Sequence, residues 1–167
     1  NSKGVNELLS SWTDLEMENL SLKIIGTGDI EEELRKKYTN RNIQFIGELS
    51  NEATISEIKN ARAVITATKM YEGQPRLLCE ASSLGVPSIY PSFGGMDDFF
   101  PEDYDLSFEQ YNYSDLKKKI ILLKDSNFVK NESMKAYNHI KKKLDREIIF
   151  TEFDQAIKAM AKKGIDL

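Results

Sequence analysis

Residues 71–87 read YEGQPRLLCEASSLGVP, and the rest of the chain is organised around this stretch. It begins as a Gly/Pro turn and continues as an apolar run that predicts a helix. Pro75 suits the first turn of a helix, because its missing N–H would have no intrahelical partner and its φ is already helical. We therefore expect a helix that begins near Pro75, with Glu72 in the loop before it and Glu80 about a turn and a half inside it.

The N-terminus of this predicted helix suits an anion. Backbone N–H groups of a first turn have no intrahelical partner, and the positive end of the helix dipole lies there. Because Pro75 has no N–H, the candidate donors are Gln74, Arg76 and Leu77. Carboxylates accept hydrogen bonds from sugar hydroxyls, so the ligand that suits both the donors and the two glutamates is a sugar linked to phosphate.

The chain alternates short apolar runs with helical patterns, which predicts βαβ units. The fold class is therefore α/β, a Rossmann-like parallel sheet with helices on both faces. Asp29 is expected to cap the second helix. Strands are expected at 22–25, 43–46, 63–67, around 88–90 and at 105–108, and helices at 5–13, 30–38, 51–60, from about 75, and at 114–124, 127–143 and 146–163.

Four turns follow the predicted strands, and they predict a single site. They are Gly26-Thr27-Gly28, Gly47, residues 68–74 and Gly94-Gly95. Ligands of open α/β sheets bind at the carboxyl ends of the strands, where these turns would meet. The first turn is a weak dinucleotide fingerprint, because Glu31 stands at the third glycine position, and an ordinary tight turn stays open as its alternative.

Several short sequence words occur in a fixed order along the chain. They are Lys3-Gly4, Glu72 and Glu80 separated by seven residues, Gly73-Gln74-Pro75, Glu80-Ala81, Gly85-Val86-Pro87 and Gly94-Gly95. This ordered set resembles the group 1 (family 4) retaining glycosyltransferases of the GT-B fold, in their C-terminal, donor-binding domain. The resemblance implies one nucleotide-sugar-binding domain over residues 1–167, with C-terminal helices at about 114–163. Since Asn1 is not an initiator Met, we expect a fragment of a longer chain whose N-terminal acceptor domain is missing.

The resemblance also implies roles for individual residues. Glu80 would bind the two ribose hydroxyls, Glu72 would approach the transferred sugar, and Lys3 would meet the diphosphate. A solvated side chain is the alternative for each of these three. The remaining donor-binding candidates are Gly26, Gly28, Gly73, Gln74, Arg76, Leu77, Gly94 and Gly95.

The implied reaction transfers a hexose-type sugar from a nucleoside diphosphate sugar to an acceptor hydroxyl, with retention and in polysaccharide biosynthesis or another glycosylation pathway. Neither a metal ion nor a cofactor is expected, and the fragment alone is expected to be inactive. Two alternatives stay open: a non-catalytic GT-B-like scaffold in a glycosylation complex, and a nucleotide-sugar epimerase.

Composition excludes several other classes. The 167 residues carry a net charge of −4, which argues against nucleic acid as a partner, and one Cys and one His exclude an internal disulfide and the usual zinc sites. Cys79 is expected to be a buried, inert thiol. With no signal peptide or apolar run of membrane-spanning length, we expect a cytoplasmic domain. The lysine runs 117–119 and 141–143 are typical of solvated faces, and a peripheral contact of the full-length protein with the inner face of the membrane stays open.

Overall fold

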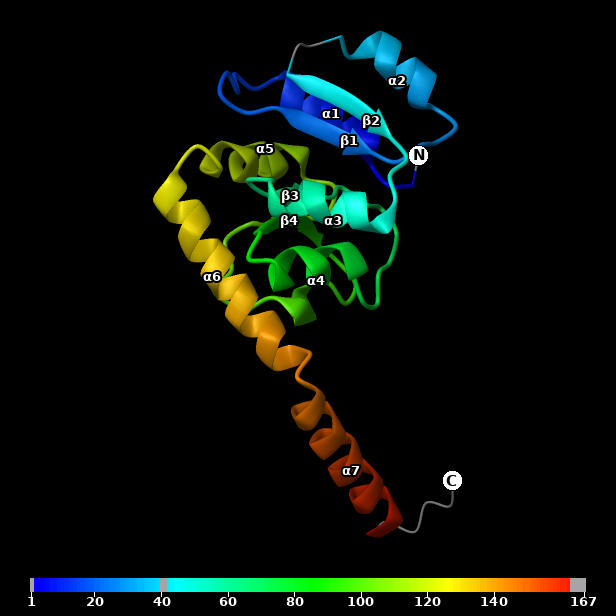
Figure 1. Ribbon diagram of the computed structural model, residues 1–167, viewed down its shortest axis with the longest axis vertical. Helices are drawn as coiled ribbons and strands as arrows, with labels where there is room; N and C mark the ends of the chain where they lie inside the picture. The colour runs from blue at the N-terminus through cyan, green and yellow to red at the C-terminus, as the bar shows by residue number, and fades with distance from the viewer. Residues whose placement is uncertain (1, 40–41, 163–167) are drawn as a thin grey trace.

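The computed structural model describes residues 2–39 and 42–162, which form an α/β body and one protruding helix (Figure 1). The elements in chain order are α1 (Val5–Thr13), β1 (Leu22–Ile25), α2 (Glu31–Lys37), β2 (Ile43–Gly47), α3 (Asn51–Lys59), β3 (Val64–Ile65), α4 (Arg76–Ser83), β4 (Ser88–Ser92), the 3₁₀ turn η1 (Asp97–Phe99), β5 (Ser107–Glu109), α5 (Tyr113–Leu122), α6 (Ser126–Lys143) and α7 (Arg146–Lys162).

The strands pair in parallel, as predicted. β1 pairs with β2, and β4 lies between β3 and β5. Side chains alternate between the two faces of a strand, and residues 88–91 of β4 are all buried, so both faces of this strand are covered. α4 and α5 both pack on β4; α4 also packs on α3, and α5 on α1. The predicted α/β fold class is therefore confirmed.

The strands form two hydrogen-bonded groups instead of one continuous sheet, because β1 and β3 do not pair with each other. Val64 N–H donates to Pro87 O, which turns this amide toward β4. Since successive N–H groups of a strand point to opposite sides, the amide of Ile65 points away from β4, and that of Lys23 points away from β2. A cavity of about 580 Å³ lies between β1 and β3, lined also by α1 and α3.

A cluster of three aromatic rings fixes the segment after β4. Tyr90 stacks on Phe100 with ring centroids 4.3 Å apart, and Phe100 lies 4.6 Å from Tyr104. The Tyr104 hydroxyl donates to Ser88 O at 2.9 Å and accepts from Ser88 N–H at 2.7 Å. Burial raises the pKa of both tyrosines, which stay neutral. The rings and these bonds hold the chain back against β4.

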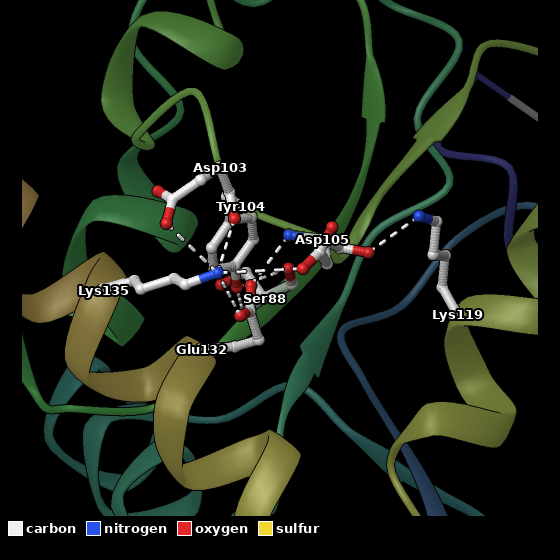
Figure 2. A network of polar contacts seen from close by, with 7 residues as sticks. All are labelled: Ser88, Asp103, Tyr104, Asp105, Lys119, Glu132 and Lys135. Carbon is white, nitrogen blue, oxygen red and sulfur yellow. Dashed lines mark hydrogen bonds and ion pairs between the residues drawn. The ribbon is translucent and has the colours of Figure 1, made fainter.

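A buried carboxylate connects α6 to the loop before β5. Glu132 is 1% exposed, and its carboxylate accepts from Asp105 N–H and from Lys135 Nζ, both at 2.8 Å. Figure 2 shows Lys135 reaching Asp103 as well, while Lys119 on α5 donates to Asp105 O at 2.7 Å. These contacts join α5, α6 and the loop before β5 into one unit.

Some predicted boundaries are wrong. The predicted strand 63–67 is only Val64–Ile65, and Pro75 occupies the N-cap of α4, one position before its first helical residue. Asp29 does not cap α2, whose N-cap is Ile30. The predicted end of the last helix at 163 lies outside the described residues.

α7 extends away from the body (Figure 1). Its 17 residues follow the capping carboxylate of Asp145, which accepts from Glu147 N–H at 3.0 Å. Exposed apolar side chains occur along the helix: Ile148, Ile149, Phe150, Phe153 and Ile157. Within the described residues, α7 therefore has an apolar surface that no other element covers.

Candidate active site

Lys3 and Glu72, both predicted site residues, meet directly. Lys3 Nζ donates to Glu72 Oε1 at 2.9 Å, although the two residues are 69 positions apart. Ser2 O accepts from Lys69 N–H at 2.9 Å, which holds the chain before Lys3 beside the segment that follows β3. The N-terminal end of α1 and the loop after β3 thus bring a cation and a carboxylate together at the carboxyl end of β3.

Gly4 sets the position of Lys3. Its φ is +66°, and a Cβ at this residue would lie 1.9 Å from Ala67 O. Only glycine fits so close to that carbonyl with a left-handed backbone. Because Gly4 O accepts from Leu8 N–H in the first turn of α1, the close contact with Ala67 fixes where this helix begins.

The predicted pair Gly94-Gly95 packs on the loop that carries Glu72. Gly95 N–H donates to Glu72 O at 2.9 Å, and a Cβ on Gly95 would lie 2.5 Å from Gly73 O. Gly94 has a φ of +68°, and its Cβ would lie 3.0 Å from Glu72 O. The two glycines, together with Gly73, let two loops touch through their backbones, so they position Glu72.

Gly95→Ala is expected to move the Glu72 loop and weaken ligand binding at this edge roughly tenfold, because the added methyl group cannot share space with Gly73 O. Gly47→Ala is the control, since a Cβ at Gly47 would meet no described atom within 4 Å, so this variant adds the strain of a positive φ without a clash. Calorimetric titration with nucleoside diphosphates measures the effect. Equal binding by Gly95→Ala and the wild type would contradict this account of the loop.

The N-terminus of α4 is open toward the same region. Its first intrahelical bond runs from Cys79 N–H to Pro75 O, so the N–H groups of residues 76–78 precede the helical ladder. No side chain of a described residue caps it, whereas Ser50 caps α3 and Asp125 caps α6. Gln74 and Leu77, both predicted here, are exposed at this end. The helix start can therefore receive an anion.

Glu80 lies one turn into α4 and is held by an arginine. Arg76 Nε donates to Glu80 Oε1 at 2.7 Å, and Arg76 Nη2 donates to Asn51 Oδ1 at 2.8 Å. Asn51, the first residue of α3, was missed by the sequence analysis. Its only signal was its place just after the Gly47 turn, one of the four turns expected at the site.

The two ion pairs of the site are solvent-accessible. The side chain of Lys3 is 62% exposed and that of Arg76 is 74% exposed, against 30% for Glu72 and 27% for Glu80. Pairs of this kind contribute only about 0–1 kcal/mol to stability. Lys3 can therefore exchange its carboxylate for another anion at little cost.

Gly26 and Gly28 lie after β1, apart from these contacts. Gly26 N–H donates to Gly47 O at 2.7 Å, and a Cβ on Gly26 or Gly28 would meet no described atom within 4 Å. Both glycines follow a parallel strand, as predicted, but they do not pack on the Glu72 loop.

Cys79 is buried, as predicted. Burial, with a smaller contribution from the charge of Glu80, raises the pKa of the Cys79 thiol to about 11. The thiol is therefore protonated at neutral pH and is a poor nucleophile.

Within residues 2–39 and 42–162, His, Cys, Asp and Glu side chains do not gather in threes that could bind a metal ion. The helices found there are too short or too polar to cross a membrane.

The family model of the group 1 glycosyl transferases matches residues 1–144. The chain belongs to this family. The match includes Lys3, Glu72, Glu80 and Gly94-Gly95, so the predicted membership of group 1 is confirmed on the part of the chain that forms the site.

Relatives of this group 1 glycosyltransferase chain include the amylovoran biosynthesis glycosyltransferase AmsD of Erwinia amylovora. It is 32% identical over 88 residues, which is 52% of this chain and 25% of AmsD. A sucrose-phosphate synthase from Thermosynechococcus elongatus has a TM-score of 0.78 at 17% identity, covering 97% of this chain and 43% of that protein. Anabaena HepE in complex with UDP has a TM-score of 0.78 at 14% identity, covering 95% of this chain and 46% of HepE.

These similarities show the fold of the chain and how much of each related protein it covers. At such low identity the solved structures show the fold alone, and they confirm the predicted GT-B type of α/β fold. The group 1 glycosyltransferase chain spans less than half the length of each of these three proteins.

Proposed function

We propose that this chain is the donor-binding part of a glycosyltransferase that moves a sugar from a nucleoside diphosphate sugar to an acceptor hydroxyl, with retention of the anomeric configuration. The observation that carries the proposal is the Lys3–Glu72 contact beside the open N-terminus of α4, with Glu80 one turn inside that helix. It supplies cationic and N–H donors for phosphate and two carboxylates for hydroxyls at one edge of the fold.

Each group has a role in the proposed transfer. The diphosphate gains negative charge as it leaves the sugar, and Lys3 with the N–H groups of α4 would stabilise that charge. Glu80 would accept hydrogen bonds from the ribose hydroxyls, and Glu72 from hydroxyls of the transferred sugar. Lys3 would leave Glu72 for phosphate, which the weak, exposed pair permits. The proposal needs neither a metal ion nor a cofactor.

The names of solved neighbours support a nucleoside diphosphate ligand. HepE is described in complex with UDP and with UDP-glucose, and TarM from S. aureus in complex with UDP. Those ligands belong to those proteins, and for this chain we propose a uridine, guanosine or adenosine diphosphate donor.

We also propose that transfer requires a longer polypeptide with an acceptor domain. The cavity between β1 and β3 supports this. β1 and β3 each have an edge on this cavity, and one more parallel strand could pair with both. Ser2, bonded to Lys69, lies where such a strand would leave the cavity toward Lys3. The uncovered apolar side chains of α7 are further support. A cytoplasmic location, and any contact with the membrane surface, stay predictions.

Lys23→Pro tests whether a further strand occupies this cavity in a longer polypeptide, since it removes a backbone N–H that points into the cavity. We expect it to destabilise a longer polypeptide by about 1 kcal/mol more than this chain, because a strand in the cavity would lose one ladder bond. Lys23→Ala is the matched control: it loses the 2.6 Å contact with Glu57 but keeps the N–H. Urea unfolding of both variants, in this chain and in the longer polypeptide, measures the difference. If Lys23→Pro destabilises both proteins equally, a further strand does not occupy the cavity.

Transfer itself is tested on the full-length polypeptide with UDP-, GDP- and ADP-sugars. Release of nucleoside diphosphate identifies the donor, and NMR of the product gives its anomeric configuration. We expect one donor to be used and its configuration to be kept. An inverted product would contradict retention, and a folded protein that uses and binds none of the donors would favour a non-catalytic scaffold.

A further inference from the structure

Asn51 is linked to the candidate site through Arg76. The guanidinium of Arg76 lies between two acceptors, Glu80 Oε1 at 2.7 Å from Nε and Asn51 Oδ1 at 2.8 Å from Nη2. Asn51 and Arg76 are the first residues of α3 and α4, so this bridge joins the starts of two helices. The two helices follow β2 and β3, at the edge where the predicted site residues meet.

The amide of Asn51 is available for this contact because its neighbour caps the helix. Ser50 Oγ accepts from Ala53 N–H at 3.2 Å and so takes the capping role at the start of α3. An Asn at the cap would turn its side-chain oxygen back toward the helix. One position later, Asn51 directs that oxygen to Arg76.

We propose that Asn51 is a positioning residue: it holds Arg76, and Arg76 in turn holds Oε1 of Glu80, which leaves Oε2 to accept hydrogen bonds from the donor nucleotide. The inference rests on the proposed function, in which Glu80 binds the ribose hydroxyls. Asn51 is neutral, so it fixes the guanidinium without competing with Glu80 for its charge. An aspartate there would keep the acceptor but share that charge.

The orientation of the Arg76 guanidinium depends on both of its hydrogen bonds, the one to Glu80 and the one to Asn51. The side chain of Arg76 is 74% exposed, and a single exposed pair between residues 76 and 80 restrains it little. Two bonds to the fixed fork of one guanidinium define its plane, and a lysine could make only one of them in the same geometry. The orientation of the Glu80 carboxylate therefore depends on Asn51 through Arg76.

A double-mutant cycle tests the inference, with calorimetric titration of UDP, GDP and ADP as the readout. Asn51→Ala is expected to weaken binding about three- to tenfold, the loss of a hydrogen bond to a charged group at an exposed site. Asn51→Asp, which keeps an acceptor oxygen, should recover most of that loss. The double variant Asn51→Ala/Arg76→Ala should bind no more weakly than Arg76→Ala alone.

The remaining outcomes separate this inference from the function on which it rests. If the penalties of Asn51→Ala and Arg76→Ala multiply, Asn51 acts without Arg76 and the inference is overturned, while the proposed function stands. If the wild type binds none of the three nucleotides, both are overturned. A merely structural role predicts a lower midpoint of thermal unfolding for Asn51→Ala, whereas we expect an unchanged midpoint. In the full-length polypeptide the same variant should raise the donor KM and leave kcat unchanged.

Discussion

Gly4→Ala is expected to lower the free energy of unfolding by about 3 kcal/mol, the sum of a left-handed backbone penalty and an overpacking penalty. The new methyl group would lie 1.9 Å from Ala67 O, and backbone on both sides leaves no flexible side chain to yield. α1 packs on α5 and contributes Leu8, Leu9 and Trp12 to the core, so a displaced helix start disturbs buried contacts. Urea unfolding followed by circular dichroism measures the loss.

Gly28→Ala is the control for this substitution. A Cβ at Gly28 would meet no described atom within 4 Å, and its φ is not in the left-handed region. Replacing such a glycine is neutral or stabilises by about 0.4–1 kcal/mol, because the unfolded chain loses freedom. If Gly4→Ala unfolds at the same urea concentration as Gly28→Ala, the close contact with Ala67 does not exist in solution.

Glu132→Ala is expected to cost about 2 kcal/mol, because it removes a buried, hydrogen-bonded carboxylate, while the partly exposed Lys135 keeps Asp103 and Asp105 as partners. The variant leaves Asp105 N–H without its acceptor and Lys135 without its 2.8 Å partner (Figure 2). The attachment of α6 to the loop before β5 would then be weaker and would rest on the contacts of Lys135 with Asp103 and Asp105. Thermal unfolding and hydrogen exchange of residues 103–107 report this loss.

Glu132→Gln and Glu147→Ala complete the series. Glutamine keeps an acceptor for Asp105 N–H, so we expect about half the cost of alanine. Glu147 lies in the exposed first turn of α7, and its replacement should change stability by less than about 0.5 kcal/mol. A cost of Glu132→Ala as small as that of Glu147→Ala would show that the buried contact does not hold α6.

The same contact predicts a dependence on alkaline pH. The hydrogen bond to Glu132, followed by smaller effects of charge and of Asp103, raises the pKa of Lys135 above its ordinary 10.5. The stabilisation is therefore complete below about 10.5 and is lost as the pH rises through the higher folded pKa. Glu132→Gln should lose less stability than the wild type across that alkaline range.

Local sequence patterns predicted most of the fold. The apolar spacing of residues 5–13 predicted α1 with its observed limits, and the run Leu22–Ile25 predicted β1. Glu72 and Glu80 were placed correctly relative to α4, because a Gly/Pro turn before an apolar helix is a local signal. Strand ends were less predictable: hydrogen bonding to β4 limits β3 to two residues, which the apolar run 63–67 does not reveal.

The contacts that build the site lie beyond local patterns. Lys3 and Glu72 meet only because the start of α1 and the loop after β3 lie at the same edge. Gly95 meets Gly73 because the loops after β4 and β3 lie there as well. Asn51 could not be linked to Arg76 without the relative placement of two helices. Such contacts depend on strand order and helix packing, which the sequence constrains weakly.

Calorimetric titration of this chain with UDP, GDP, ADP and their sugar conjugates tests the central claim most directly, with Glu80→Ala and Glu147→Ala as matched variants. We expect one nucleoside diphosphate to bind, Glu147→Ala to bind it equally well, and Glu80→Ala to bind roughly 30-fold more weakly, the equivalent of about 2 kcal/mol for a hydrogen bond to a carboxylate. Equal binding by Glu80→Ala and the wild type would contradict the assignment of this edge as the donor site.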